Sequence, residues 1–196
     1  MSHRVIIIML VFSLYVSCGG PSSPPEGPVN QEADYLRSGR EIALASFAVI
    51  SGKLQKELTE GGVEQAIDFC HQNVYPIFAS LSLSYNAEIK RTSFKLRNQK
   101  NFPSVVERYA LKKYEESQEA GASLEPQIVN GEDGRAIFIA PILIQPLCLR
   151  CHGELGKDLR EIDYSHILAR YPRDRAIGYQ IGQLRGIWSV TFNEDG

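Results

Sequence analysis

The sequence has very little methionine, and this shortage limits the chemistry open to most of the chain. Its two methionines, Met1 and Met9, both lie within the first nine of 196 residues. No methionine thioether is therefore available as a metal ligand after position 9. Internal repeats are also absent, and no low-complexity segment follows the first thirty or so residues. The length is that of one domain with a sizeable core.

A strong excess of charge of either sign is also missing. The formal net charge is −2 and the isoelectric point is about 6.1. No run of basic residues exceeds ordinary surface patterning. A nucleic-acid-binding domain usually has a concentrated basic patch, because it must neutralise phosphates. The composition therefore argues against nucleic acid as a partner.

No hydrophobic run at the N-terminus is long enough to cross a membrane by itself. The apolar run from Val5 to Val16 has twelve residues, whereas a transmembrane helix needs about 20. His3 and Arg4 give this run a short basic start. The pattern is typical of an export signal, which we assign to residues 1–17.

A cysteine follows the predicted export signal directly. Ser17 and Cys18 resemble the lipobox of bacterial lipoproteins, in which the cysteine is lipidated and becomes the mature N-terminus. Tyr15 departs from the small aliphatic residue usual there, so plain signal cleavage and an uncleaved anchor stay open. Residues 18–33 are predicted to form a disordered tether to a domain over residues 34–196. We expect an exported protein on the periplasmic side, anchored to the membrane by lipid.

The sequence has four cysteines, of which only two form a closely spaced pair. Cys148 and Cys151 are separated by two residues, and His152 follows directly. A structural zinc site usually needs two such pairs, and a thioredoxin motif lacks the adjacent histidine. The spacing is typical of covalent c-type haem attachment, in which both thiols add to haem vinyl groups and the histidine binds the iron. The motif predicts one covalent haem c.

The first part of the predicted domain has the periodicity of helices. From Asp34, apolar residues recur every three or four positions, until residues 60–62 end a first helix. A second helix is expected over residues 63–81. Pro76 should kink or divide it, because proline removes a backbone hydrogen bond and clashes with the preceding turn.

The rest of the domain is expected to consist mostly of strands. Four strands are predicted, over residues 87–93, 124–129, 135–144 and 184–192. The third is apolar along nearly its whole length, so both its faces should be covered. Further helices are expected over residues 103–120 and 162–171. The buried candidates of the first of these are Val105, Val106, Tyr109, Ala110 and Tyr114. Helices followed by a mostly antiparallel sheet make an α+β layout.

The motif does not decide the second axial ligand of the iron. Cys70, His71, His166, a lysine and an open position are all compatible with the residues. Cys70 lies in the middle of the apolar face of the second helix, and His71 lies toward its edge. A single thiol in an oxidising compartment is either employed or buried. A cysteine packed in a helix core is an equally good interpretation of Cys70.

Four segments, in order, resemble the motifs of a family of exported c-type haem proteins with a PAS-like fold. The segments are residues 70–76, 91–103 (RTSFKLRNQKNFP), 140–153 and 171–186 (YPRDRAIGYQIGQLRG). Members of that family occur as stand-alone bacterial proteins, cyanobacterial ones among them, and as sensor modules of histidine kinases. Gln99 departs from the family pattern, which usually has proline at this turn, but it touches no proposed ligand.

The resemblance implies a PAS-like antiparallel sheet with N-terminal helices and an unusual axial pair, here His152 and Cys70. A thiolate ligand donates negative charge to the iron and stabilises the ferric form, so a low potential is expected. Arg91, Arg97 and Arg185 are candidates to neutralise the haem propionates, because guanidinium pairs with carboxylates bidentately. Ordinary solvated surface charge is the alternative for each.

Two classes of function stay open at this point. A sensor of redox state or of a diatomic gas fits the six-coordinate iron, because loss of Cys70 would release the second helix. Since no kinase or other output segment precedes Gly196, a sensor needs a separate signalling protein. A low-potential periplasmic electron-transfer cytochrome with a redox partner protein fits the small size, covalent haem and tether. An enzyme is not favoured, because no distal acid–base pair accompanies the haem.

Overall fold

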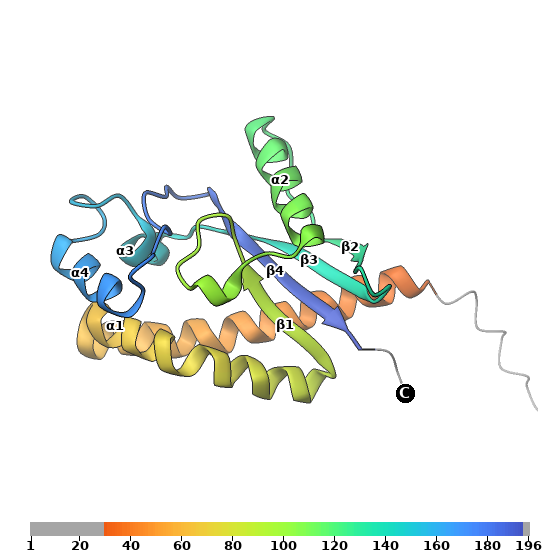
Figure 1. Cartoon of the computed structure of the whole chain (residues 1–196), viewed down its shortest axis with the longest axis horizontal. Coiled ribbons are helices and arrows are strands. Elements are labelled where there is room, and N and C mark those ends of the chain that lie inside the picture. The colour runs from red at the N-terminus through yellow and green to blue at the C-terminus, as the bar shows by residue number, and fades with distance from the viewer. Residues whose placement is uncertain (1–29, 194–196) are drawn as a thin grey trace, which may run out of the picture.

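The computed structural model describes residues 30–193 of the chain. Its centre is a four-stranded antiparallel sheet with the strand order β1-β4-β3-β2 (Figure 1). The strands are β1 (Ala87–Thr92), β2 (Gln127–Asn130), β3 (Ala136–Leu143) and β4 (Leu184–Phe192). All four overlap strands predicted from the sequence. Together with the helices they confirm the α+β prediction.

A long helical element, α1 (Gln31–Tyr85), covers one face of the sheet. Its two halves are separated at Gly62, whose φ of 70° and ψ of −160° are not helical. Glycine adopts this conformation at little cost because it has no Cβ, and it lies within the break predicted at residues 60–62. Figure 1 shows the second half returning alongside the first.

The ends and the interior of α1 differ from expectation in two respects. The helix begins at Gln31 rather than at Asp34, because the Asn30 side chain accepts a hydrogen bond from the Ala33 amide at 3.4 Å and caps it. Pro76 does not divide the second half, since Gly62 alone within α1 has non-helical dihedral angles. Over residues 30–193, no helix is long and apolar enough to cross a membrane.

The remaining helices are short connectors around the sheet, apart from α2. They are η1 (Gln99–Asn101), α2 (Val105–Glu119), η2 (Pro146–Cys148), α3 (Leu149–His152) and α4 (Glu161–Arg170). The buried face of α2 consists of Glu107, Ala110, Leu111 and Tyr114. The expectation that Val105 and Tyr109 are buried is wrong, because they lie off this face and are 55% and 63% exposed.

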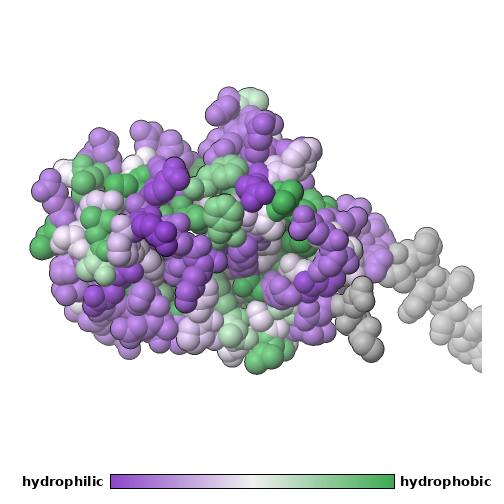
Figure 2. Space-filling model, viewed as in Figure 1, coloured by the Kyte–Doolittle hydropathy of each residue, from purple (hydrophilic) through white to green (hydrophobic). Residues whose placement is uncertain are grey.

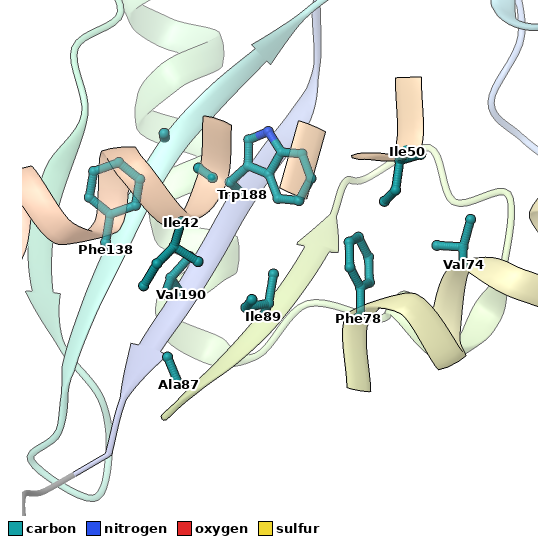
Figure 3. Packing of buried hydrophobic residues seen from close by; sticks show 11 residues of the cluster. Ile42, Ile50, Val74, Phe78, Ala87, Ile89, Phe138, Trp188 and Val190 are labelled. Atoms are coloured by element: carbon teal, nitrogen blue, oxygen red, sulfur yellow. The ribbon is translucent and has the colours of Figure 1, made fainter. Parts of the chain in front are cut away.

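The core has a cluster on each face of the sheet. On the α1 side, Phe138 and Trp188 pack with Ile42 and Phe78 from the two halves of α1 (Figure 3). On the other side, the three isoleucines Ile137, Ile139 and Ile187 pack against the buried face of α2. β3 therefore has both faces covered, as its apolar sequence predicted. A third cluster joins the Gly62 end of α1 to α4.

Candidate functional site

A cavity of about 240 Å³ is bounded by α1, the sheet, the loop after β1 and α3. It collects the residues named for thioether attachment, for the proposed axial pair and for the propionates, which are Cys70, Arg91, Arg97, Cys148, Cys151, His152 and Arg185. Cys18 lies outside the described residues. The fold thus brings together side chains from four segments that are far apart in the sequence, at residues 70, 91–97, 148–152 and 185.

The mouth of the cavity has an apolar rim. Phe47, Leu143 and Leu147 line the cavity and are 49%, 37% and 39% exposed. The outer surface is mostly hydrophilic, with hydrophobic patches over its centre and over the end that carries α3 and α4 (Figure 2). Exposed apolar side chains around a cavity are typical of a ligand or partner site.

The segment from η2 to α3 positions the paired cysteines. Helical turns bring residues three apart to the same side, so Cys148 and Cys151 both line the cavity. Pro146 opens η2, where a missing amide proton costs nothing. The three described cysteines form no disulfide. Burial raises the pKa of the Cys151 thiol to about 11, and Arg97 acts in the opposite direction. The Cys151 thiol is therefore protonated at neutral pH, and neither thiol of the pair is tied up in a disulfide.

His152 has one ring nitrogen fixed by the backbone. Its Nδ1 lies 2.6 Å from the carbonyl oxygen of Ala176. A carbonyl oxygen can only accept, so Nδ1 carries the proton and Nε2 keeps a lone pair, which is the state a metal ligand needs. Burial lowers the pKa of His152 well below its ordinary value, and the nearby Arg97 and Arg185 lower it further. The imidazole is therefore neutral.

Two of the cavity arginines have no carboxylate partner among residues 30–193. The guanidinium carbon of Arg91 lies 5.2 Å from the ring centroid of Phe78 and 5.4 Å from that of Trp188. Arg185 lies 5.5 Å from the ring centroid of Tyr179, and burial lowers its pKa to about 10. A buried cation without an anion is costly, so both guanidinium groups are suited to an anionic ligand.

Arg97 is engaged differently from the other two arginines. Its Nε and Nη2 both donate to the Asp174 carboxylate at 3.2 Å. Its Nη2 also donates to the Cys151 carbonyl at 2.6 Å. The side chain of Arg97 is 12% exposed and that of Asp174 is fully buried. Arg97 therefore joins the haem-motif segment to the loop that contains Asp174.

Among the candidate second ligands, Cys70 shares the cavity with His152. Burial raises the pKa of the Cys70 thiol, and Arg91 and Arg97 act to lower it. His71 is exposed, with its ring 5.3 Å from that of Tyr171. His166 lies on α4, where its Nδ1 is 3.5 Å from a Glu64 carboxylate oxygen. Neither histidine and no described lysine lines the cavity.

The residues present fit the haem that the sequence predicts. The cavity offers the paired thiols of Cys148 and Cys151, the thiol of Cys70, a neutral imidazole with an available Nε2, guanidinium groups without a carboxylate partner in the described chain, and aromatic walls. Sequence reasoning did not single out Tyr171, Trp188 or Asp174 for this region. Tyr171 and Asp174 belong to the segment 171–186, so the family motif was the available signal for them. Trp188 lies in the last predicted strand and packs in the core cluster on the α1 side of the sheet.

Fold and cavity together define an α+β protein with a CxxCH segment on the wall of a ligand-sized cavity. The model of the Tll0287-like family, described as Tll0287, matches residues 30–193, and the chain belongs to this family. Among solved structures, the chain is similar to that of the cyanobacterial heme-protein Tll0287, with a TM-score of 0.50 and 19% identity. That match covers 78% of this chain and 96% of the other. No curated protein matches the sequence.

Proposed function

We propose that this protein binds one haem c covalently, through thioethers from Cys148 and Cys151, with His152 as an axial ligand. The observation that carries the proposal is the hydrogen bond from His152 Nδ1 to the Ala176 carbonyl, which leaves Nε2 free beside two unbridged thiols. The description of a solved relative as a heme-protein supports it. When bound, the haem supplies a redox-active iron that is able to take a second axial ligand.

Cys70 is the second axial ligand in this proposal. Its position in the same cavity as His152 supports the assignment, as does the absence of lysine and of any second histidine from the described cavity wall. Burial raises the pKa of its thiol, and Arg91 and Arg97 offset part of this rise. Binding to iron would itself release the thiol proton, because a cysteine binds metal as the thiolate. The alternative of a merely packed cysteine predicts no spectroscopic contribution from Cys70.

Arg91 and Arg185 are the proposed partners of the haem propionates. Neither has a carboxylate partner within the described chain, and both line the cavity. Arg97 is a weaker candidate, because Asp174 and two backbone carbonyls already accept from its guanidinium. Bidentate pairing with a carboxylate would neutralise the charge that burial makes costly.

The proposed role is that of a PAS-like sensor of redox state or of a diatomic gas. Cys70 lies on the second half of α1, and Val74 and Phe78 of that half pack into the main core. A change at Cys70 therefore acts on a helix that contacts the sheet directly. The signal would pass to a separate signalling protein, because a switch needs an element that reads out its two states.

A low-potential electron-transfer cytochrome is the second candidate function. The exposed apolar rim formed by Phe47, Leu143 and Leu147 supports it, since electron transfer needs a partner to approach the cofactor closely. Reversible reduction without loss of Cys70 would favour this candidate. Dissociation of Cys70 or binding of carbon monoxide or nitric oxide in the ferrous protein would favour the sensor.

The test of haem binding and of its ligands uses the absorption and electron paramagnetic resonance (EPR) spectra of the ferric protein. We expect a low-spin thiolate signature in the wild type and its loss in Cys70→Ala, with the pigment still attached. His71→Ala is the matched control, because its ring is exposed one position away on the same helix. A thiolate signature that persists in Cys70→Ala would refute the ligand assignment. Pigment that acidified organic solvent extracts would refute covalent attachment.

Export and lipidation complete the proposal. Residues 1–17 are the proposed export signal, and Cys18 is the proposed lipid attachment site. The lipid would hold the domain at the periplasmic face of a membrane. Expression of Cys18→Ser beside the wild type tests this assignment. We expect the wild type in the membrane fraction and the variant in the soluble periplasmic fraction. Equal distribution of both proteins would contradict lipidation.

A further inference from the structure

We propose that Arg97 and Asp174 are positioning residues for His152, acting through the backbone of Ala176, whose amide contacts Asp174 and whose carbonyl contacts Arg97. The effect of this positioning on the iron rests on the proposed haem binding. The position of the imidazole does not depend on that proposal, because the contacts that fix it are made within the chain. Asp174 does not line the cavity, so it would act on the site only through other residues.

The backbone of Ala176 is held at both of its polar groups, which belong to the two peptide units on either side of its Cα. Its amide nitrogen donates to Asp174 Oδ1 at 2.9 Å. Its carbonyl oxygen accepts from His152 Nδ1 at 2.6 Å and from Arg97 Nη2 at 3.4 Å. Arg97 therefore contacts the carbonyl that His152 uses, while Asp174 fixes the peptide unit directly before it and so limits how far that carbonyl can turn.

The same arginine also holds the haem-motif segment. Arg97 Nη2 donates to the Cys151 carbonyl at 2.6 Å, one residue before His152. Backbone bonds continue this attachment, with the amides of Gly178 and Tyr179 donating to the carbonyls of Gly153 and His152 at 2.8 and 3.0 Å. The backbone of the histidine and the acceptor for its ring are thus fixed to one another through a single guanidinium.

Burial makes this arrangement dependent on both charges. The side chain of Asp174 is fully buried and that of Arg97 is 12% exposed. Removing one partner of a buried pair leaves the other uncompensated, so the remaining side chain must move or recruit water. Either change would loosen the backbone of Ala176 and with it the hydrogen bond from His152 Nδ1. Such a bond orients a histidine ligand and raises its basicity, so its weakening would change how strongly His152 donates to the iron.

Two variants that remove charges of opposite sign distinguish an effect on the position of His152 from a direct electrostatic effect on the iron. Asp174→Ala removes a negative charge, and Arg97→Gln removes a positive one. If the pair positions His152, both variants weaken the ring's donation to the iron and both raise the midpoint potential. We expect the ferric-to-ferrous ratio at the wild-type midpoint to fall about tenfold in each, which is about 59 mV for a one-electron couple. A midpoint potential that rises in Asp174→Ala but falls in Arg97→Gln would overturn the proposal.

A measurement on the ring proton completes the test. Hydrogen exchange of the His152 Nδ1 proton, followed by nitrogen-15 nuclear magnetic resonance (NMR) in the reduced protein, should be at least tenfold faster in both variants. Asp174→Asn keeps an acceptor for the Ala176 amide and should show a smaller change. Glu107→Gln is the matched control, since Glu107 forms a buried ion pair with Lys90 away from the cavity. Unchanged exchange in Asp174→Ala and Arg97→Gln would refute the positioning role.

The outcomes of the two proposals can be told apart. A colourless purified protein would refute haem binding, while the Nδ1 exchange measured in that protein would still decide whether Arg97 and Asp174 hold the ring. If Asp174→Ala fails to fold by circular dichroism, Arg97→Gln and Asp174→Asn carry the test. Their EPR spectra should then show a second set of low-spin g values, as expected for a histidine in more than one orientation.

Discussion

Lys90 and Arg91 are neighbours on β1, yet their surroundings differ completely. The Lys90 ammonium lies 2.7 Å from the Glu107 carboxylate and also donates to the Phe102 carbonyl. Arg91 faces the other side of the sheet, over Phe78 and Trp188, with no described carboxylate beside it. On the α2 face of the sheet, the charge of Lys90 is neutralised within the chain, and we call this the complete face. The α1 face contains cations that a ligand would neutralise.

The two faces also differ in their polar contacts. On the α2 side, Glu107 accepts from the Ser104 amide and Tyr114 donates to the Glu125 carbonyl, both at 2.7 Å. On the α1 side, the cavity thiols and the guanidinium group of Arg91 make no ion pair with the described chain. Buried groups that serve stability are normally satisfied. The cavity groups that lack an ion-pair partner in the described chain are therefore the better candidates for function.

The largest effect should come from removing the paired thiols. We expect Cys148→Ala with Cys151→Ala to lose covalent pigment completely, because no described thiol other than Cys70 remains in the cavity. Glu107→Gln, on the opposite face, should keep its pigment. Retention is measured as haem stain on a denaturing gel. Pigment that survives in the double variant would show that attachment does not use this pair.

The complete face should depend strongly on its ion pair. We expect Glu107→Ala to lower the free energy of unfolding by about 2 to 3 kcal/mol, because it breaks a partly buried pair and the cap of α2 together. Urea unfolding followed by circular dichroism measures the loss. Lys112→Ala is the control, since its ion pair is exposed and contributes little. A Glu107→Ala loss no larger than that of Lys112→Ala would contradict the comparison.

Unlike Glu107, Arg91 should contribute to stability only when the proposed haem is bound. In the colourless double cysteine variant, Arg91→Gln should change the free energy of unfolding by less than about 1 kcal/mol, because it removes a buried charge that has no partner. In the pigmented protein the same change should lower the melting temperature clearly. Equal effects in the two backgrounds would argue against a propionate partner at Arg91.

The smallest effect concerns pH on the complete face. Burial raises the pKa of Tyr114 from 10 to about 12. The folded state therefore holds this proton more tightly, so its contribution is present below pH 10 and is lost as the pH rises from 10 to 12. Tyr114→Phe should lose about 1 kcal/mol at pH 8 and should show a shallower fall above pH 10. Parallel curves for the two proteins would exclude this contribution.

Much of the fold could be predicted from local pattern. The break at residues 60–62, the four strands and the helix over residues 162–171 follow from periodicity and turn residues, because these act between near neighbours. Val105 and Tyr109 were misjudged because they are apolar residues near the start of a helix, and only docking on the sheet decides which face is buried. Pro76 was expected to kink or divide the second helix, and it does not divide it, since the dihedral angles there stay helical.

The sequence by itself determined the spacing of Cys148, Cys151 and His152, on which the proposed haem chemistry depends, because this spacing is a local property of five residues. Tertiary structure alone decided which distant side chains share that site. It brought Cys70 and the arginines to one cavity, and it paired Arg97 with Asp174 across 77 positions. Such contacts depend on how the sheet and α1 pack, and no periodicity in the chain encodes the distance between two remote charges.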